Sequence, residues 1–286
     1  MKEVVSLLEK HVYEREIDRM QGLNVLLDFL VDMFDYRHYI KEDGFANNIK
    51  EKSETEPYLF KIALIWLDKV ANAMDKGSFF DFFGNIYEEM YQSKSKASQF
   101  GQFFTPPQIA ELMAMICQDE NRKDYTCADP SGCGSGRTLL AHYAVNKFSN
   151  CYYRADDLDI VSVKMCALNM MAHGMRGQVV QHDTLVNPIL FDFGYEVNEI
   201  RYPIPTPYLS LRKIKYSKKE LERDNKRVLK RYGDNVVERN MCHNKEMIKQ
   251  IIPSDDAKPK PIFENKEVKV NPSFESIQLN LFGDNW

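Results

Sequence analysis

A turn rich in small residues, Cys133-Gly134-Ser135-Gly136, places the strongest constraint on how this chain folds. It follows a short predicted strand, Tyr125 to Asp129, and precedes a predicted helix, Arg137 to Lys147. Glycine has no Cβ, so its backbone adopts left-handed conformations and can approach a ligand closely. This order of strand, glycine turn and helix is typical of a loop that binds a nucleotide-like ligand.

Strands and helices are expected to alternate after this turn. Further strands are predicted at Cys151 to Ala155 and at Gln178 to Gln181, with a helix at Ile160 to Gly174 between them. Alternation of this kind predicts an α/β fold built on a parallel sheet. The pattern decays beyond Leu185, and residues between Leu190 and Leu211 offer too little room for several more strands. We therefore expect an abbreviated, truncated sheet.

The first 95 residues carry helical patterns instead. Apolar residues recur at spacings of three and four from Val4 to Phe34 and from Tyr58 to Met74. In the aromatic-rich stretch Phe79 to Tyr91, core packing is favoured over base stacking. We predict four regions, which are an α-helical N-terminal domain at 1–95, an α/β domain at 96–211, a basic helical segment at 212–252 and a flexible tail at 253–286.

The glycines alone do not identify the ligand. A dinucleotide-binding loop has the pattern G-x-G-x-x-G, and Gly132 and Gly134 fit its first two positions, but Arg137 occupies the third. A large side chain there would hinder close packing of helix on strand, so a nicotinamide cofactor is disfavoured. Asp157 ends the second predicted strand, where a carboxylate can accept hydrogen bonds from two ribose hydroxyls. The alternative is a solvated acid in a turn.

Four motifs stand in an order that resembles the N-6 DNA methylase family, the adenine-specific methyltransferases that include modification subunits of type I restriction systems. They are Gly101 to Pro107; Asp129-Pro130 with the glycine loop; Asp157-Leu158-Asp159 leading to Leu168-Asn169 and His173-Gly174; and Asp183. The resemblance runs from about Phe82 to about Leu185. It implies a Rossmann-like methyltransferase domain that binds S-adenosylmethionine and acts on DNA in a restriction-modification or related system.

The resemblance also implies which residues hold the methyl donor. Gln102 to Pro107 would cover its amino-acid end, Ser131 to Gly136 would pass beneath the methionine and ribose, Asp157 would hold the ribose hydroxyls, and Asp183 would face the adenine amino group. The predicted donor-binding residues are Gln102, Phe103, Phe104, Thr105, Pro106, Asp129, Ser131, Gly132, Cys133, Gly134, Gly136, Asp157 and Asp183. From the residues themselves, Thr105 is expected to cap a helix from Pro106 to Gln118.

The chain departs from the family's pattern in its glycine loop. Asp129 stands one residue further from Cys-Gly-Ser-Gly than in the family, so either Gly132 is a bulge or the acid is displaced from its usual contact.

A larger departure concerns catalysis, because the tetrapeptide Asn-Pro-Pro-Phe or Asn-Pro-Pro-Tyr is missing. This motif accepts hydrogens of the target amine and stacks on the flipped base. Asn187-Pro188 follows Asp183 too closely and lacks an aromatic residue, and Thr206-Pro207-Tyr208 lacks an amide. No catalytic residue is assigned. The chain is either an enzyme whose amide comes from an irregular segment or a second chain, or a catalytically inactive accessory or partner subunit.

Composition limits the other classes of function. With 44% hydrophobic residues among 286, the chain can form a sizeable core, yet no run approaches the roughly 18 apolar residues of a membrane helix. We therefore expect a cytoplasmic protein without a membrane partner. The six cysteines show no metal-ligand spacing, so no metal is predicted. The net charge of −4 argues against a uniformly basic surface, and the basic run Arg212 to Arg231 is either a solvated helix face or a DNA contact.

The tail carries a short peptide, Gln278-Leu279-Asn280-Leu281-Phe282, which resembles the Q-L-x-L-F motif by which bacterial DNA enzymes bind the sliding clamp. Gln278 would supply a directional amide, while Leu279, Leu281 and Phe282 would fill an apolar pocket. The alternative is a tail that docks on its own domain. The predicted partners are thus DNA, a specificity or second methylase subunit, and the clamp.

Overall fold

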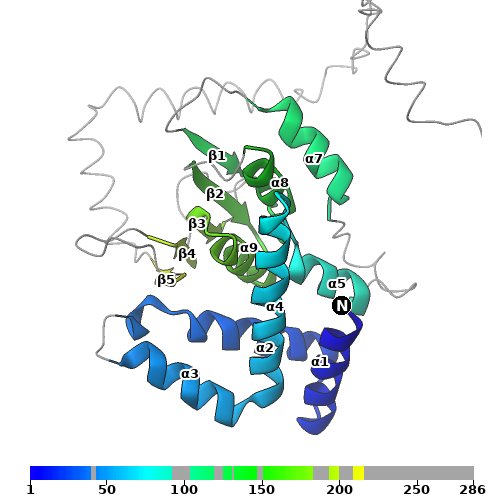
Figure 1. Ribbon diagram of the computed structural model, residues 1–286, viewed down its shortest axis with the longest axis vertical. Coiled ribbons are helices and arrows are strands. Elements are labelled where there is room, and N and C mark those ends of the chain that lie inside the picture. The colour runs from blue at the N-terminus through cyan, green and yellow to red at the C-terminus, as the bar shows by residue number, and fades with distance from the viewer. Residues whose placement is uncertain are drawn as a thin grey trace, which may run out of the picture. The chain divides into compact units, whose positions relative to one another are not determined.

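The computed structural model describes residues 1–39, 43–91, 104–118, 125–130, 132–146, 151–182, 193–199 and 209–215. The chain divides into two compact units, Met1–Glu222 and Arg223–Trp286. All described residues lie in the first unit, and these residues are drawn in colour in Figure 1.

The N-terminal part of this unit is helical, as the apolar periodicity predicts. Its elements, blue to cyan in Figure 1, are α1 (Lys2–Glu14), α2 (Arg19–Met33), a 3-10 turn η1 (Tyr36–His38), α3 (Gly44–Thr55), α4 (Pro57–Asp75) and α5 (Phe82–Tyr91). The predicted pattern from Val4 to Phe34 is two helices because Asp18 starts a new one. Its side chain accepts a hydrogen bond from the Gln21 N–H in a capping box. Helix α3 was not predicted.

The remaining part is a five-stranded sheet with flanking helices. The strands are β1 (Thr126–Asp129), β2 (Tyr152–Asp157), β3 (Arg176–Gln181), β4 (Phe193–Val197) and β5 (Leu211–Ile214), in the order β1-β2-β3-β4-β5. The helices are α7 (Pro107–Ile116), α8 (Arg137–Val145) and α9 (Ile160–Ala172). The predicted α/β alternation between Tyr125 and Gln181 is therefore confirmed.

The sheet is mixed, so the prediction of a parallel sheet holds only for its first part. Strands β1, β2 and β3 are parallel neighbours, whereas β4 and β5 pair antiparallel. Residues 182–192 join β3 to β4, and they are fewer than the dozen or more that a parallel crossover requires. The sequence predicts no regular alternation of strands and helices beyond Leu185. That prediction is wrong for β4, which is a strand of the sheet. The predicted basic helix is also wrong at its start, because Arg212 and Lys213 lie in β5.

The start of α7 also differs from its prediction. Its N-cap is Pro106 rather than Thr105, no side chain caps it, and Pro107 is the first helical residue. A residue that precedes proline is disfavoured in the helical conformation, and Pro106 accordingly has extended backbone angles, φ −54° and ψ 143°. The double proline thus moves the helix start one residue along the chain.

One hydrophobic core joins the N-terminal helices to the sheet. Trp66 of α4 is fully buried and lies edge-on to Phe83 of α5, with 5.1 Å between ring centroids. Helix α9 contacts α2 and α5 as well as β2 and β3. The core-packing interpretation of the aromatic stretch is thereby confirmed, since Phe82 and Phe83 are both inaccessible. The core contains residues from both sides of the predicted domain boundary at residue 95. The division of the chain into four regions remains a prediction.

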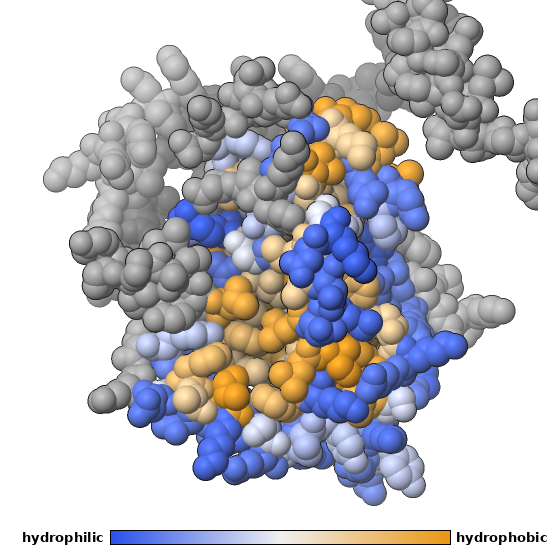
Figure 2. All heavy atoms as spheres, viewed as in Figure 1, coloured by the Kyte–Doolittle hydropathy of each residue, from blue (hydrophilic) through white to orange (hydrophobic). Residues whose placement is uncertain are grey.

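Helix α7 has an unusual distribution of side-chain sizes. Its small residues Ala110 and Ala114 pack with Ala141 of α8. Its large apolar residues point outward and remain 48–75% exposed, and Figure 2 shows hydrophobic side chains gathered where Figure 1 places this helix. They are Ile109, Leu112, Met113, Met115 and Ile116.

Candidate functional site

The glycine loop connects β1 to α8 and has the conformation that only glycine adopts easily. Gly134 has φ +55°, and Gly136, the N-cap of α8, has φ +84°. A Cβ atom on Gly134 would lie 2.8 Å from the Phe104 ring, and one on Gly136 would lie 2.8 Å from the Cys166 Sγ. The backbone of the loop therefore lies against two other segments of the chain.

Asp157 ends β2 and holds this loop. Its Oδ2 accepts a hydrogen bond from the Gly134 N–H at 2.9 Å, and its Oδ1 accepts one from the Asp159 N–H at 2.9 Å. Burial raises the pKa of Asp157, and the two backbone hydrogen bonds oppose that rise. Asp157 is half-buried, and it makes one local turn contact, with Asp159, and one contact with the loop, at Gly134. Since each carboxylate oxygen has two lone pairs, each can accept a further hydrogen bond.

The extra residue in the loop is accommodated at Gly132. The N–H groups of Gly132 and Cys133 both donate to the Asp156 carbonyl, each at 3.1 Å, and Gly132 has φ +124°. Two consecutive residues thus face one on the neighbouring strand, which is the arrangement of a bulge. Asp129 makes its own contact, accepting a hydrogen bond from Thr138 Oγ1 at 2.7 Å. Of the two alternatives for the longer spacing, the structure favours the bulge.

Phe104 and Thr105 lie beside the loop. The Phe104 ring, which faces Gly134, stands edge-on to Tyr87 at 5.2 Å between centroids. The guanidinium of Arg137 lies 5.7 Å from the centre of the same ring, and its Nη1 donates to the Thr105 carbonyl at 3.0 Å. Thr105 therefore contributes its backbone oxygen to this region.

Cys133 is buried in the loop and is poorly suited to nucleophilic chemistry. Its hydrogen bond with Cys166, together with burial, raises the pKa of the Cys133 thiol well above its ordinary value. The reactive form of cysteine is the thiolate, so a neutral thiol acts here as a small packing residue. The described residues also contain no group of three or more His, Cys, Asp or Glu side chains that could hold a metal.

A buried polar cluster behind the loop was not predicted. Its centre is Asp81, which precedes α5 and is 4% exposed. The Asp81 carboxylate accepts hydrogen bonds from Ser135, Arg137 and Asn169. Asp81 also accepts from the Gly84 N–H, three residues on, which is an N-cap contact that the sequence could have indicated. From the sequence, Arg137 was considered only as a large side chain that would hinder packing of helix on strand. In the structure it is buried and forms ion pairs with Asp81 and Glu88.

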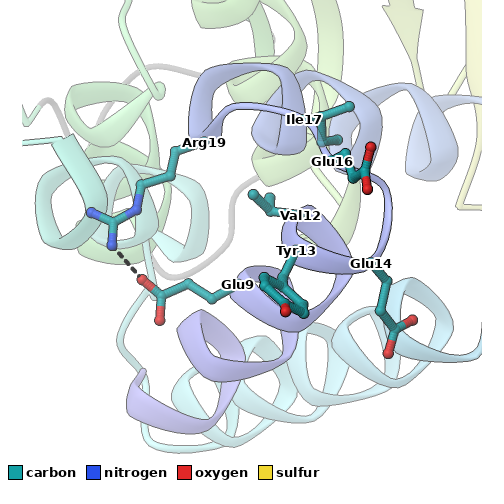
Figure 3. A pocket seen from close by; sticks show the side chains of 7 residues that line it. All are labelled: Glu9, Val12, Tyr13, Glu14, Glu16, Ile17 and Arg19. Atoms are coloured by element: carbon teal, nitrogen blue, oxygen red, sulfur yellow. Dashed lines mark hydrogen bonds and ion pairs between the residues drawn. The ribbon is translucent and has the colours of Figure 1, made fainter.

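An open depression of about 760 Å³ lies elsewhere, between α1 and the start of α2 (Figure 3). It contains none of the predicted donor-binding residues, and its lining includes three glutamates, of which Glu9 is paired with Arg19 at 2.7 Å. Exposed carboxylates of this kind form ordinary solvated surface. The glycine loop, where backbone amides and an ordered carboxylate converge, remains the candidate site.

Several predicted residues lie outside the part of the chain that the structure describes. They are Gln102, Phe103, Ser131, Asp183, the segments 187–188 and 206–208, and the tail peptide 278–282. Of the described candidates, Phe104, Gly132, Cys133, Gly134, Gly136 and Asp157 are brought together, with Thr105 and Asp129 at the margins. Within the described ranges, no helix is both long and apolar enough to cross a membrane.

A family model and one curated protein match this chain. The model of the family described as N-6 DNA Methylase matches residues 79–255, more than half of the chain. The type I restriction enzyme MpnII methylase subunit of Mycoplasma pneumoniae (strain ATCC 29342 / M129 / Subtype 1) is 34% identical over 116 residues, which cover 37% of this chain and 21% of that protein. This chain thus matches about a fifth of the length of its curated relative.

Among solved structures, the type I restriction-modification system methyltransferase subunit from Streptococcus thermophilus aligns with a TM-score of 0.33 and 14% identity. The alignment covers 67% of this chain and 62% of that chain.

Proposed function

We propose that this chain, which belongs to the N-6 DNA methylase family, binds the methyl donor S-adenosylmethionine at its glycine loop. The observation that carries the proposal is the contact between Asp157 and the Gly134 N–H, because it joins the carboxylate that would hold the ribose to the backbone that would underlie the donor. The donor, when bound, supplies a methyl group on a positively charged sulfur.

The described residues suit such a ligand. Ligands of open α/β sheets bind outside the carboxyl ends of the parallel strands, which is where Asp129 and Asp157 stand at the ends of β1 and β2. The carboxylate of Asp157 would accept hydrogen bonds from the two ribose hydroxyls through its remaining lone pairs. Helix α8 begins after Gly136 without a side-chain cap, and the N–H groups at a helix start suit an anion such as the carboxylate of the donor. Phe104 would border the same space.

We further propose that the chain serves adenine-N6 methylation of DNA in a restriction-modification system. Its curated relative is a methylase subunit of a type I restriction enzyme, so a specificity subunit or a second methylase subunit is the expected partner besides DNA. A second candidate function is that of a catalytically inactive donor- or DNA-binding accessory. The absence of an Asn-Pro-Pro-Phe or Asn-Pro-Pro-Tyr tetrapeptide from all 286 residues favours this second candidate.

Titration calorimetry with S-adenosylmethionine tests the donor proposal. We expect the full chain to bind the donor, and Asp157→Ala to weaken binding by about 1.5–3 kcal/mol, the value of hydrogen bonds to a charged group. Asp28→Ala is the matched control, because Asp28 is an acid of α2 whose side chain is 63% exposed and pairs with Lys164 away from the loop. Unchanged affinity in Asp157→Ala would remove Asp157 from the site, and a wild-type chain without affinity would overturn the proposal.

A further inference from the structure

Four buried polar side chains connect the glycine loop to distant parts of the chain. We call them the loop anchor, and they are Asp81, Ser135, Arg137 and Asn169, which are 4%, 1%, 3% and 0% exposed. Asp81 precedes α5, Ser135 and Arg137 end the loop and begin α8, and Asn169 lies on α9. Burying these polar groups costs free energy that their hydrogen bonds offset, and among their buried atoms Arg137 Nη2 and Asn169 Oδ1 have no hydrogen-bond partner.

The carboxylate of Asp81 is saturated with donors. Its Oδ2 accepts from Ser135 Oγ and from Arg137 Nε, both at 2.6 Å. Its Oδ1 accepts from Asn169 Nδ2 at 2.8 Å and from the Gly84 N–H at 2.9 Å. Four donors match the roughly four lone-pair sites of an ionised carboxylate. An asparagine at this position would lose one acceptor and place an N–H group against donors.

Arg137 extends this constraint to the other side of the site. Its Nη1 donates to Glu88 Oε1 at 2.9 Å and to the Thr105 carbonyl at 3.0 Å. Burial disfavours its charge, but the hydrogen bond with Glu88 and the charge of Asp81 outweigh burial and raise the pKa of Arg137. A permanently charged, planar guanidinium thus ties the end of the loop to the Phe104–Thr105 segment.

Helix α9 holds Asp81 through Asn169. Asn169 also donates to the Ser135 carbonyl at 2.9 Å, so it contacts both the acid and the loop. One turn later, His173 Nε2 accepts a hydrogen bond from the Phe80 N–H at 3.2 Å, while its Nδ1 lies 2.7 Å from the Asn169 carbonyl. Burial lowers the pKa of His173 to about 4, so the ring is neutral near pH 7 and can accept through Nε2. The residues before α5 are therefore held in one position.

We propose that Asp81 is a positioning residue for the donor site. Its carboxylate contacts none of the predicted donor-binding residues. It holds the loop through Ser135 and Arg137, and Arg137 extends that constraint to Phe104 and Thr105. The net stability from a buried ion pair is small because desolvation offsets the attraction, but removing one partner leaves the other charge buried and unpaired, which is costly. The inference rests on the proposed donor binding, and it makes the segment before α5 part of the donor site.

The test compares Asp81→Asn with the wild-type chain in hydrogen exchange, thermal melting and donor calorimetry. The loss of hydrogen bonds to a charged acceptor should speed exchange of peptides covering residues 132–139 by about tenfold or more, and should weaken donor affinity by about tenfold or more. Exchange of α1 to α4 should not change. Exchange is measured without the donor, so a wild-type chain that fails to bind the donor would refute the proposed function and still leave the anchor tested.

The matched control is Asn198→Gly. Asn198 is 1% exposed, and its side chain donates to the carbonyls of Met171 and Met175 at the end of α9, away from the loop. Its φ of +50° is one that glycine adopts without strain. Asn198→Gly should lower the melting temperature and leave loop exchange and donor affinity unchanged. The proposal is wrong if the loop peptides of Asp81→Asn exchange at the wild-type rate. It is also wrong if both variants lose the same amount of melting temperature and speed exchange of the loop peptides by the same factor.

A milder variant covers the case in which Asp81→Asn does not fold. Ser135→Ala removes one of the four donors to Asp81 and leaves the ion pair with Arg137 intact. It should speed exchange of the same loop peptides by about threefold to tenfold, as expected for loss of a single hydrogen bond. Wild-type exchange in a folded Ser135→Ala protein would overturn the proposal.

Discussion

Replacing Gly134 with alanine is expected to weaken donor binding by roughly 10-fold to 100-fold, because the hydrogen bonds of the charged Asp157 that the change disturbs contribute about 1.5–3 kcal/mol. Gly134 has φ +55°, a conformation that costs alanine about 1–2 kcal/mol. The added Cβ would also lie 2.8 Å from the Phe104 ring, so the ring or the loop must move. That movement would disturb the hydrogen bond between the Gly134 N–H and Asp157. Calorimetry with S-adenosylmethionine measures the change.

Gly77→Ala separates this local effect from the cost of backbone strain. Gly77 has φ +71°, and a Cβ there would meet no atom within 4 Å. The substitution therefore carries a similar backbone cost without a steric clash and far from the loop in sequence. We expect both variants to melt at a lower temperature, but only Gly134→Ala to lose donor affinity. Equal losses of affinity would show that general destabilisation, and not the loop, is responsible.

The second large effect concerns methyl transfer. The chain is incubated alone with tritiated S-adenosylmethionine and mixed DNA. It should methylate adenine at least about 100-fold more slowly than a complete family member, because preorganised acceptors at the reacting nitrogen contribute a rate factor of that size. The target amine is a poor nucleophile unless an amide oxygen and a backbone carbonyl accept its hydrogens. Addition of a partner subunit that supplies this amide should restore transfer.

Two asparagine variants make this prediction sharper. Asn187-Pro188 lacks an aromatic residue at the stacking position, whereas Asn271-Pro272-Ser273-Phe274 carries an amide, a proline and an aromatic ring in the order of the missing tetrapeptide. Both segments lie outside the described residues. Rapid transfer by the chain alone would contradict the prediction. Its loss in Asn187→Ala or in Asn271→Ala would then identify which segment supplies the amide.

The sequence predicts the glycine loop well because the relevant signals are local. Gly134 and Gly136 stand between a strand and a helix, and Asp157 ends the next strand, so parallel pairing alone brings them to one edge of the sheet. Core packing of Phe82 and Phe83 followed from their helical spacing. The start of α7 was mispredicted by one residue because the conformational effect of Pro107 on Pro106 outweighs the capping preference of Thr105.

The parts that the sequence did not predict depend on long-range contacts. Asp81 meets Ser135 across 54 positions and Asn169 across 88, and no pattern in a single sequence indicates that pairing. Strand β4 is short, and its antiparallel pairing with β3 depends on the length of the connection between them. Leu168-Asn169 and His173-Gly174 were noted only as motif residues, and the structure shows that Asn169 and His173 fix the segment before α5.

Donor binding at the glycine loop is tested most directly by a hydrogen-exchange footprint of the full chain with and without saturating S-adenosylmethionine. A donor on the glycine loop should slow exchange in peptides covering residues 104–106 and 132–139, and it should leave the depression between Glu9 and Arg19 unchanged. Slower exchange confined to that depression, or no change at the loop while calorimetry shows the donor bound, would contradict the proposed site.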